Sequence, residues 1–275
     1  MISFLQTYSQ QLASTLQHQI KPKKMNKIAL VTGGSRGLGK DMALSLAKKN
    51  IDVILTYNNN QTDAEEVVKT IEASGQKAVA LKLDVGDIKS FESFLGQVSE
   101  VLQSKWQTST FDFLINNAGI GGTVPIANMT EEIFDNFVNI HFKGVYFLTQ
   151  KSLLMMNDGG AIIFLSSGTT RFCLPGYSVY SSLKSAVENF TKYVAKEYGN
   201  RGIRSNIVAP GPIETDFNGA AIRNNPQMKG FLSSQTALGR VGYADDIGSV
   251  VAFLCTEDAK WINGQRIEVS GGINL

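Results

Sequence analysis

The chain has 275 residues, of which 43% are hydrophobic and 18% are charged, and its formal net charge is +2. A chain of this size can bury its own core, and its nearly neutral charge gives no reason to expect binding to nucleic acid or to an anionic membrane. No apolar run approaches the roughly 20 residues of a membrane-spanning helix, and with two histidines no metal site is expected. The two cysteines, Cys173 and Cys255, form no C-x-x-C pair, which fits a reducing, cytoplasmic compartment.

Residues 1–24 contain no acidic residue, and their apolar side chains can share one face of a helix. The basic start and apolar stretch of a signal peptide are absent, and so are the arginines of an import presequence. We therefore expect a loosely ordered N-terminal extension over residues 1–24. The rest of the chain, residues 25–275, is expected to form one domain.

Short apolar runs alternate with longer helical patterns along this domain. The seven strand candidates are residues 28–33, 52–57, 78–85, 111–117, 161–167, 203–210 and 265–272. The stretches between them are long enough for right-handed crossovers, and residues 134–148 show helical spacing. The pattern predicts an α/β fold, a single doubly wound, Rossmann-type domain with a seven-stranded parallel sheet covered on both faces. Residues 211–240 show no strong period and are expected to form a mobile lid.

The first strand candidate runs into TGGSRGLGK (residues 32–40), where Gly33, Gly37 and Gly39 precede a helical pattern. Such a strand, glycine turn and helix start can bring backbone N–H groups and the helix dipole close to a pyrophosphate. A plain tight turn is the alternative, because the spacing differs from the common G-x-G-x-x-G. Two further polar strand ends, residues 84–85 and 116–119, should reach the same carboxyl edge of the sheet, where open parallel sheets bind ligands.

The charges near this turn favour NADP over NAD. The second strand candidate ends in LTYNNNQ (residues 55–61), and no acid follows until Asp63, whereas an NAD site usually offers a carboxylate to the ribose 2′-hydroxyl there. Arg36 lies within the glycine turn, where a guanidinium can pair with a 2′-phosphate. The alternative for Arg36 is a surface cation whose stem covers the sheet edge.

Tyr180 and Lys184 in YSSLK are four residues apart, so a helix places both on one face. At about 4 Å and an effective dielectric of about 20, the ammonium stabilises an ionised phenol by about 4 kcal/mol, or about three pKa units, before desolvation opposes it. We therefore predict that the pKa of Tyr180 falls toward neutrality, so that the phenol can exchange a proton with an alcohol or carbonyl oxygen. Ser167, which ends the preceding strand candidate, can hold that oxygen. The alternatives are a chance pairing on an amphipathic helix and a serine that only caps its own turn.

Together these segments resemble the short-chain dehydrogenase/reductase family. The matches, in the family's order, are TGGSRGLG (32–39), LDV (83–85), NNAG (116–119), SS (166–167), YSSLK (180–184) and PG (210–211). The resemblance covers residues 26–275, and overall likeness suggests a 3-oxoacyl reductase-like enzyme. It implies that Tyr180 is the general acid, that Lys184 lowers its pKa and holds the nicotinamide ribose, and that Ser167 orients the substrate.

The resemblance also implies which residues contact NADP, so that residues 25–275 would be an NADP-binding catalytic domain. Besides Tyr180 and Lys184, the implied contacts are Gly33, Ser35, Arg36, Gly37, Leu38, Gly39, Asp84, Val85, Asn116, Ala118, Gly119, Pro210, Gly211, Ile213 and Thr215. Members commonly form homotetramers through the two long helices after the fourth and fifth strands. We therefore expect a homotetramer or a homodimer.

One position departs from the family pattern. Many members have an asparagine two positions before the Lys-Gly of a segment like HFKGVYFLT, where this chain has His141. In the family this asparagine holds a water of a proton relay behind the lysine, partly through its main-chain carbonyl, which survives substitution. We predict a working relay with His141 beside it and a changed pH profile, because imidazole titrates near neutrality. The alternative is a packed helix residue.

These observations predict an NADPH-dependent oxidoreductase that reduces a carbonyl of ketone or 3-oxoacyl type, with hydride from the nicotinamide and the proton from Tyr180. A nucleotide-sensing binding protein on the same fold is the alternative. The expected partner is a small-molecule carbonyl or alcohol. Several apolar residues flank the expected cleft, either to hold an apolar substrate or to pack the lid. They are Phe172, Leu174, Phe217, Phe231 and Leu232.

Overall fold

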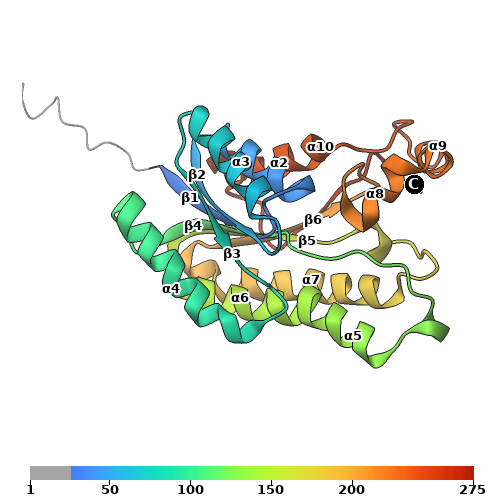
Figure 1. The fold of residues 1–275 in the computed structure, drawn as a ribbon, viewed down its shortest axis with the longest axis horizontal. Coiled ribbons are helices and arrows are strands. Elements are labelled where there is room, and N and C mark those ends of the chain that lie inside the picture. The colour runs from blue at the N-terminus through green and yellow to red at the C-terminus, as the bar shows by residue number, and fades with distance from the viewer. Residues whose placement is uncertain (1–25) are drawn as a thin grey trace, which may run out of the picture.

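The computed structural model describes residues 26–275, and at its centre lies a sheet of seven parallel strands in the order β3-β2-β1-β4-β5-β6-β7 (Figure 1). The strands are β1 Lys27–Val31, β2 Ile51–Tyr57, β3 Ala78–Lys82, β4 Phe111–Asn116, β5 Met156–Leu165, β6 Arg204–Pro210 and β7 Arg266–Val269. Each overlaps a strand candidate, so the predicted doubly wound sheet is confirmed. The expected extension over residues 1–24 lies outside the described residues.

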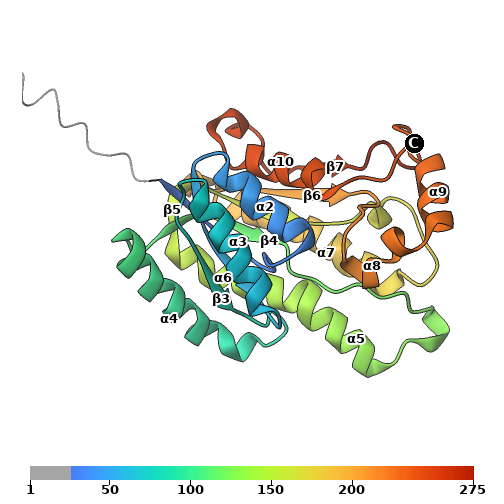
Figure 2. The same ribbon diagram turned by 45° about the horizontal axis from the view of Figure 1, so that its top comes forward.

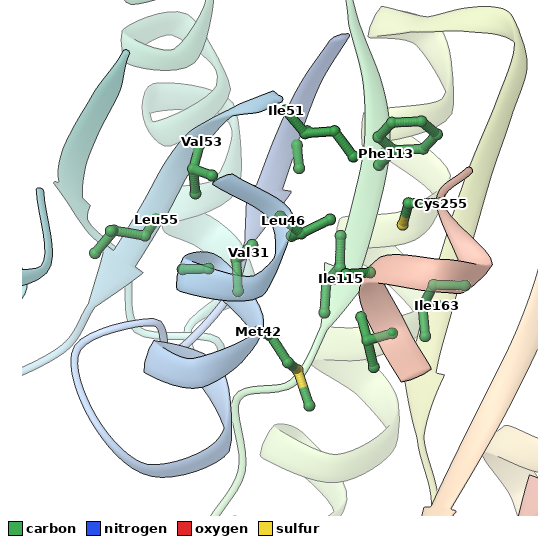
Figure 3. Packing of buried hydrophobic residues seen from close by; sticks show 14 of the residues in the cluster. Val31, Met42, Leu46, Ile51, Val53, Leu55, Phe113, Ile115, Ile163 and Cys255 are labelled. Carbon is green, nitrogen blue, oxygen red and sulfur yellow. The ribbon is translucent and has the colours of Figure 1, made fainter. Parts of the chain in front are cut away.

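Helices cover both faces of this sheet (Figures 1 and 2). They are α2 Gly37–Ala47, α3 Gln61–Ala73 and α10 Ala244–Leu254 on one face, and α4 Phe91–Val101, α5 Glu131–Val138, α6 Gly144–Ser152 and α7 Ser178–Glu197 on the other. Along β2, Val53 and Leu55 join the hydrophobic cluster on the first face, and Ile54 joins the cluster on the second. This alternation explains why consecutive positions of β2, Val53 to Leu55, are all apolar. In Figure 3, Met42 and Leu46 of α2 lie in the first cluster with strand side chains.

The position of β1 determines where a ligand can bind. Because β1 lies between β2 and β4, the chain reverses its direction of strand addition at this point. Parallel sheets bind ligands in the crevice outside the carboxyl ends of the strands at such a switch point. The glycine turn follows β1, and the NNAG segment follows β4, so both lie at this crevice.

The helical stretch expected around residues 134–148 is confirmed only in part. A π-helical turn, Asn139–Lys143, separates α5 from α6, and Phe134, expected on the buried face, is 44% exposed. A π turn rotates the face that follows it, so one 3.6-residue period does not extend across it. At Gly144, the first residue of α6, a Cβ would lie 1.9 Å from the Val85 carbonyl oxygen. The absence of a side chain therefore lets α6 approach the segment after β3.

Residues 211–240, which show no strong period in the sequence, contain two short helices, α8 Phe217–Asn224 and α9 Pro226–Ser234. Local capping explains α9: Asn225 accepts the Met228 N–H at 2.9 Å, and Pro226 occupies the first turn. Left-handed backbone at residues 218–220 kinks α8. Both helices lie at the end of the molecule where the chain terminates (Figure 1). Their mobility as a lid stays a prediction.

Within residues 26–275, no helix combines the length and the apolar character needed to cross a bilayer. In the same residues, no three His, Cys, Asp or Glu side chains come together as a possible metal site.

Candidate active site

The glycine turn between β1 and α2 is held against β2. The Gly33 N–H donates to Thr56 Oγ1 at 3.1 Å, and the Gly34 N–H donates to the Thr56 carbonyl at 2.8 Å. Gly33 has a φ of +65° and Gly37 a φ of +55°, a region that side chains rarely adopt. At Gly39 a Cβ would lie 2.1 Å from the Gly33 carbonyl oxygen. Backbone geometry therefore requires all three predicted glycines.

An asparagine that the sequence did not single out ties the end of β4 to this turn. Asn117 Nδ2 donates to the carbonyls of Thr32 at 2.8 Å and Gly33 at 3.2 Å. The Thr32 hydroxyl accepts the N–H groups of Asn117 and Ala118, both at 3.0 Å. The NNAG segment thus fixes the shape of the glycine turn.

The first asparagine of that segment serves the fold. The expected contact of Asn116 with the cofactor stays a prediction; its side chain is buried, and its Nδ2 donates to Thr149 Oγ1 of α6 at 3.1 Å. Neighbouring side chains of an extended chain point to opposite sides, so only one amide of the doublet reaches the turn. The alternation of β4 is the signal that identifies which one.

The N-terminus of α2 fits a pyrophosphate. Its cap residue, Arg36, makes no side-chain cap, and the first turn holds no acidic residue. The first backbone N–H groups of the helix therefore meet no competing oxygen from these residues and can donate to an anion. Arg36 and Lys40 are exposed, and Ser35 is half-buried beside them.

The end of β2 fits a cofactor that carries a 2′-phosphate. Asn58 and Asn59 follow the strand and are exposed. The next carboxylate, Asp63, is hydrogen-bonded to Asn60 at the start of α3. No acid of this segment is thus positioned for a ribose 2′-hydroxyl, and the residues of the crevice fit NADP.

The segment after β6 reaches the same glycine turn. Pro210 ends β6, the Gly211 N–H is bonded to β7 at 3.0 Å, and Ile213 forms an isolated bridge to the residues before α10. Thr215 is 7% exposed, and its Cβ would be 3.7 Å from a Cβ placed on Gly37. The segment that contains these four predicted residues therefore runs from the end of β6 to the glycine turn after β1.

Other predicted contact residues have structural partners. Asp84 is exposed, and its carboxylate accepts the Gly86 N–H at 2.8 Å in the turn after β3. The carbonyl of Val85 faces α6, and Leu38 packs against the first hydrophobic cluster. Gly119 is exposed after β4, and a Cβ on it would lie 2.9 Å from His141 Cε1.

The structure brings the predicted reactive residues together at the end of β5. Tyr180 and Lys184 lie one turn apart on α7. The buried Lys184 ammonium donates to the Leu165 carbonyl at 2.8 Å and lies 5.6 Å from the centroid of the Tyr180 ring. Leu165 is the last residue of β5, and Ser167 follows two positions later.

The prediction that the pKa of Tyr180 falls toward neutrality is wrong. Burial raises the pKa of Tyr180 to about 12, although a hydrogen bond with Ser167 lowers it. Burial also lowers the pKa of Lys184 to about 8. Residue spacing gives the field of the ammonium but not the size of the opposing desolvation, which is the largest cause of the shift for both groups. The phenol is therefore protonated at neutral pH.

Ser167 caps the turn that follows it. Its Oγ accepts the Thr169 N–H at 3.2 Å, at the start of the 3₁₀ turn Gly168–Thr170. This is the capping role that the sequence left open as an alternative. Because Ser167 also lies close enough to Tyr180 to lower the pKa of the phenol, capping does not remove it from the site.

His141 lies in the π-helical turn and is only 1% exposed. Its ring meets the Tyr180 ring edge-on, with centroids 5.1 Å apart and an interplanar angle of 85°. Its Nε2 is 2.9 Å from the Ile120 carbonyl oxygen. Because a carbonyl only accepts, Nε2 carries the proton and Nδ1 does not. Nδ1 is buried and has no hydrogen-bond partner in residues 26–275.

The expectation that His141 titrates near neutrality is wrong. Burial, followed by the charge of Lys184, lowers the pKa of His141 to about 3, and the hydrogen bond to Ile120 opposes this shift. The imidazole is therefore neutral at physiological pH.

Helix α8 lies over the loop that follows β4. A Cβ on Gly121 would be 2.9 Å from the Asn218 Cβ and 3.0 Å from Phe217 Cε1. Of the apolar residues expected around the cleft, Leu174 and Phe217 are exposed by 40% and 47%, and Phe231 by 63%. Phe217 therefore lies against the loop after β4 while almost half of its side chain stays exposed.

Comparison with known proteins identifies the family. Residues 33–274 match the family model described as Enoyl-(Acyl carrier protein) reductase. The Hydroxynaphthalene reductase-like protein Arp2 of Metarhizium brunneum is 34% identical over 258 residues, which cover 90% of this chain and 94% of that protein.

Two solved structures extend this similarity. The angucycline C-6 ketoreductase LanV with bound NADP has a TM-score of 0.86 at 34% identity, covering 91% of this chain and 96% of that one. A short chain dehydrogenase from Burkholderia cenocepacia J2315 in complex with NADP has a TM-score of 0.83 at 32% identity, covering 92% of this chain and 100% of that one. The chain belongs to the short-chain dehydrogenase/reductase family. The predictions of the family and of an NAD(P)-dependent oxidoreductase are confirmed.

Proposed function

We propose that the protein is an NADPH-dependent reductase that converts a ketone into an alcohol with Ser167, Tyr180 and Lys184 as its reactive side chains. The observation that carries the proposal is the convergence of these three residues at the end of β5, beside the crevice where the glycine turn begins. The similarity to LanV, whose structure contains NADP, supports both the cofactor and the type of reaction.

The crevice supplies the groups that would hold NADPH. The glycines at the start of α2 and its unpaired N–H groups would receive the pyrophosphate, and Arg36 would pair with the 2′-phosphate. Thr215 and Ile213 would meet the nicotinamide end. When bound, NADPH supplies the hydride.

Each reactive side chain has a task that its protonation state permits. Tyr180, protonated at neutral pH, gives its proton to the substrate oxygen. Ser167 donates a hydrogen bond to that oxygen and fixes its position. Lys184, anchored by the Leu165 carbonyl, keeps a cationic group beside the phenol below a pH of about 8.

His141 has a positioning role in this proposal. Its Nε2–H donates to the Ile120 carbonyl, and its ring packs against the ring of Tyr180 in a T-shaped arrangement. Since the imidazole stays neutral, it moves no proton at physiological pH, but its free Nδ1 can accept a hydrogen bond from a water next to Lys184.

We propose fused aromatic ketones as the preferred substrate class. Arp2 is named as hydroxynaphthalene reductase-like, and LanV is an angucycline ketoreductase. Apolar aromatic residues, Phe172 and Phe217 among them, flank the entrance and can pack on flat rings. A 3-oxoacyl thioester is the alternative that the sequence suggested.

Turnover with NADPH tests the proposal. The purified protein would be assayed by loss of NADPH absorbance with 1-tetralone, a 3-oxoacyl thioester and an enoyl thioester. We expect the highest kcat/KM with the aromatic ketone and a loss of at least about 10²-fold in Tyr180→Phe. Tyr193→Phe, on the exposed side of the same helix, is the matched control and should keep full activity. NADPH binding without turnover above Tyr180→Phe would instead indicate a nucleotide sensor.

We also propose that the protein is a cytoplasmic homotetramer or homodimer. Helices α5, α6 and α7, which correspond to the two long helices after β4 and β5, expose large aromatic side chains. These are Phe134, Tyr146 and Tyr193. Light scattering after size exclusion would give the mass, and cell fractionation would test the location. A monomer at micromolar concentration would contradict the assembly.

A further inference from the structure

The hydroxyl oxygen of Ser167 accepts two hydrogen bonds, both from Thr169. Its Oγ accepts the Thr169 N–H at 3.2 Å and the Thr169 hydroxyl at 3.0 Å. A serine hydroxyl has two lone pairs and one proton. Because both lone pairs accept hydrogen bonds from Thr169, the Ser167 hydroxyl can act toward the cleft only as a hydrogen-bond donor.

Thr169 is itself anchored beside the phenol. Its carbonyl accepts the Ser181 hydroxyl at 3.0 Å, and Ser181 directly follows Tyr180 on α7. Thr169 therefore bridges the end of β5 and the helix that carries the proton donor. The bridge fixes both the rotation of the Ser167 hydroxyl and its place relative to Tyr180.

We propose that Thr169 is a positioning residue that keeps Ser167 as a hydrogen-bond donor to the substrate carbonyl oxygen. This inference rests on the proposed reductase function. Without the Thr169 hydroxyl, the Ser167 oxygen regains a lone pair and can accept the phenolic proton of Tyr180. That proton would then be engaged with serine instead of the substrate, and the substrate would lose its oriented donor.

The alternative is that Thr169 only completes a capped turn. The two hypotheses differ in which group of Thr169 is required, the backbone N–H or the side-chain hydroxyl. The cap uses the backbone N–H of Thr169, which every substitution except proline keeps. The proposal requires the side-chain hydroxyl. Thr170 provides a matched control, because its hydroxyl donates to the Ser167 carbonyl at 2.8 Å and does not contact Ser167 Oγ.

The experiment compares Thr169→Val, Thr169→Ala, Thr169→Ser and Thr170→Val with the natural chain. For ketone reduction we expect kcat to fall about tenfold in the valine and alanine variants of position 169, a part of the loss that removal of an oriented donor causes. The KM for NADPH should not change. Thr169→Ser should recover activity to within about twofold, and Thr170→Val should stay within the same range, because neither removes a donor from Ser167 Oγ.

The pH profile of alcohol oxidation gives a second readout that a structural role would not move. Oxidation needs the ionised phenol, and the hydrogen bond with Ser167 lowers the pKa of Tyr180. Because this pKa is about 12, the measurable limb is the rise of the oxidation rate with pH below it; Thr169→Val and Thr169→Ala should move this rise to higher pH by about half a unit or more, while Thr170→Val leaves it in place.

Three outcomes would overturn the inference: full activity in both hydroxyl-free variants, an equal loss in Thr169→Ser, or an equal loss and shift in Thr170→Val. Alanine serves as the second test if the valine variant does not fold, as judged by thermal unfolding. Failure of the reductase function itself looks different, since the natural chain would then turn over no ketone faster than Tyr180→Phe.

Discussion

Replacing His141 with asparagine should change how stability depends on pH. In the folded protein, burial and the charge of Lys184 lower the pKa of His141 to about 3, against 6.5 for an unperturbed histidine. Below pH 6.5 the His141 imidazole becomes protonated in the unfolded chain but stays neutral in the folded protein. The stability is therefore complete above pH 6.5 and is lost progressively as the pH falls toward 3.

The size of the effect follows from this window. Each pKa unit corresponds to about 1.4 kcal/mol, so lowering the pH from 7 to 5 should remove about 2 kcal/mol of the free energy of unfolding through His141. Lys184 adds no slope there, because its folded pKa of about 8 leaves it protonated in both states. Tyr180 is likewise neutral in both states below pH 7.

Urea unfolding of the natural chain and of His141→Asn at pH 7 and pH 5 tests this reasoning. Asparagine does not titrate, and its amide is shorter than the imidazole, so loss of the hydrogen bond from Nε2 to the Ile120 carbonyl lowers stability at both pH values alike. The natural chain should lose about 2 kcal/mol more than the variant between the two pH values. Equal losses in the two proteins would refute a buried, neutral imidazole.

Three other substitutions test the cofactor crevice. Gly39→Ala should weaken NADPH binding at least about tenfold, because its Cβ would lie 2.1 Å from the Gly33 oxygen, whereas Gly96→Ala, with nothing within 4 Å, should leave a fluorescence titration unchanged. Arg36→Ala should weaken NADPH about tenfold and NADH hardly at all, and equal losses would contradict its pairing with the 2′-phosphate. Asn117→Ala should cost about 1–3 kcal/mol in chemical unfolding, because the carbonyls of Thr32 and Gly33 lose a part-buried donor.

Much of the fold could be predicted because the central strands bury both faces. The unbroken apolar run of β2 follows from Val53 and Leu55 facing one cluster while Ile54 faces the other. The glycine turn could be predicted for a related reason. Positions such as Gly39, where a neighbouring backbone comes too close for a Cβ, admit one residue type and so appear directly in the sequence.

Features that depend on tertiary partners could not be predicted in the same way. The π turn at His141 is accompanied by a bond to the Ile120 carbonyl, 21 residues earlier, which no helical period encodes. The use of Asn117 instead of Asn116 depends on the phase of β4 at its last residue. The pKa of Tyr180 depends on how deeply the site is buried, and residue spacing carries no information on desolvation.

The high pKa of the phenol bears on the direction of the proposed reaction. A general acid must be protonated before it acts, and a pKa of about 12 meets that condition throughout the physiological range. Alcohol oxidation needs the ionised phenol, which at pH 7 is present in on the order of one molecule in 10⁵. His141 stays neutral over the same range, so the first of these groups to titrate above neutrality is Lys184, near pH 8. At neutral pH the site therefore holds the protonated phenol that reduction requires. A decline of the reduction rate above neutrality would reflect deprotonation of Lys184, because the phenol ionises only at higher pH.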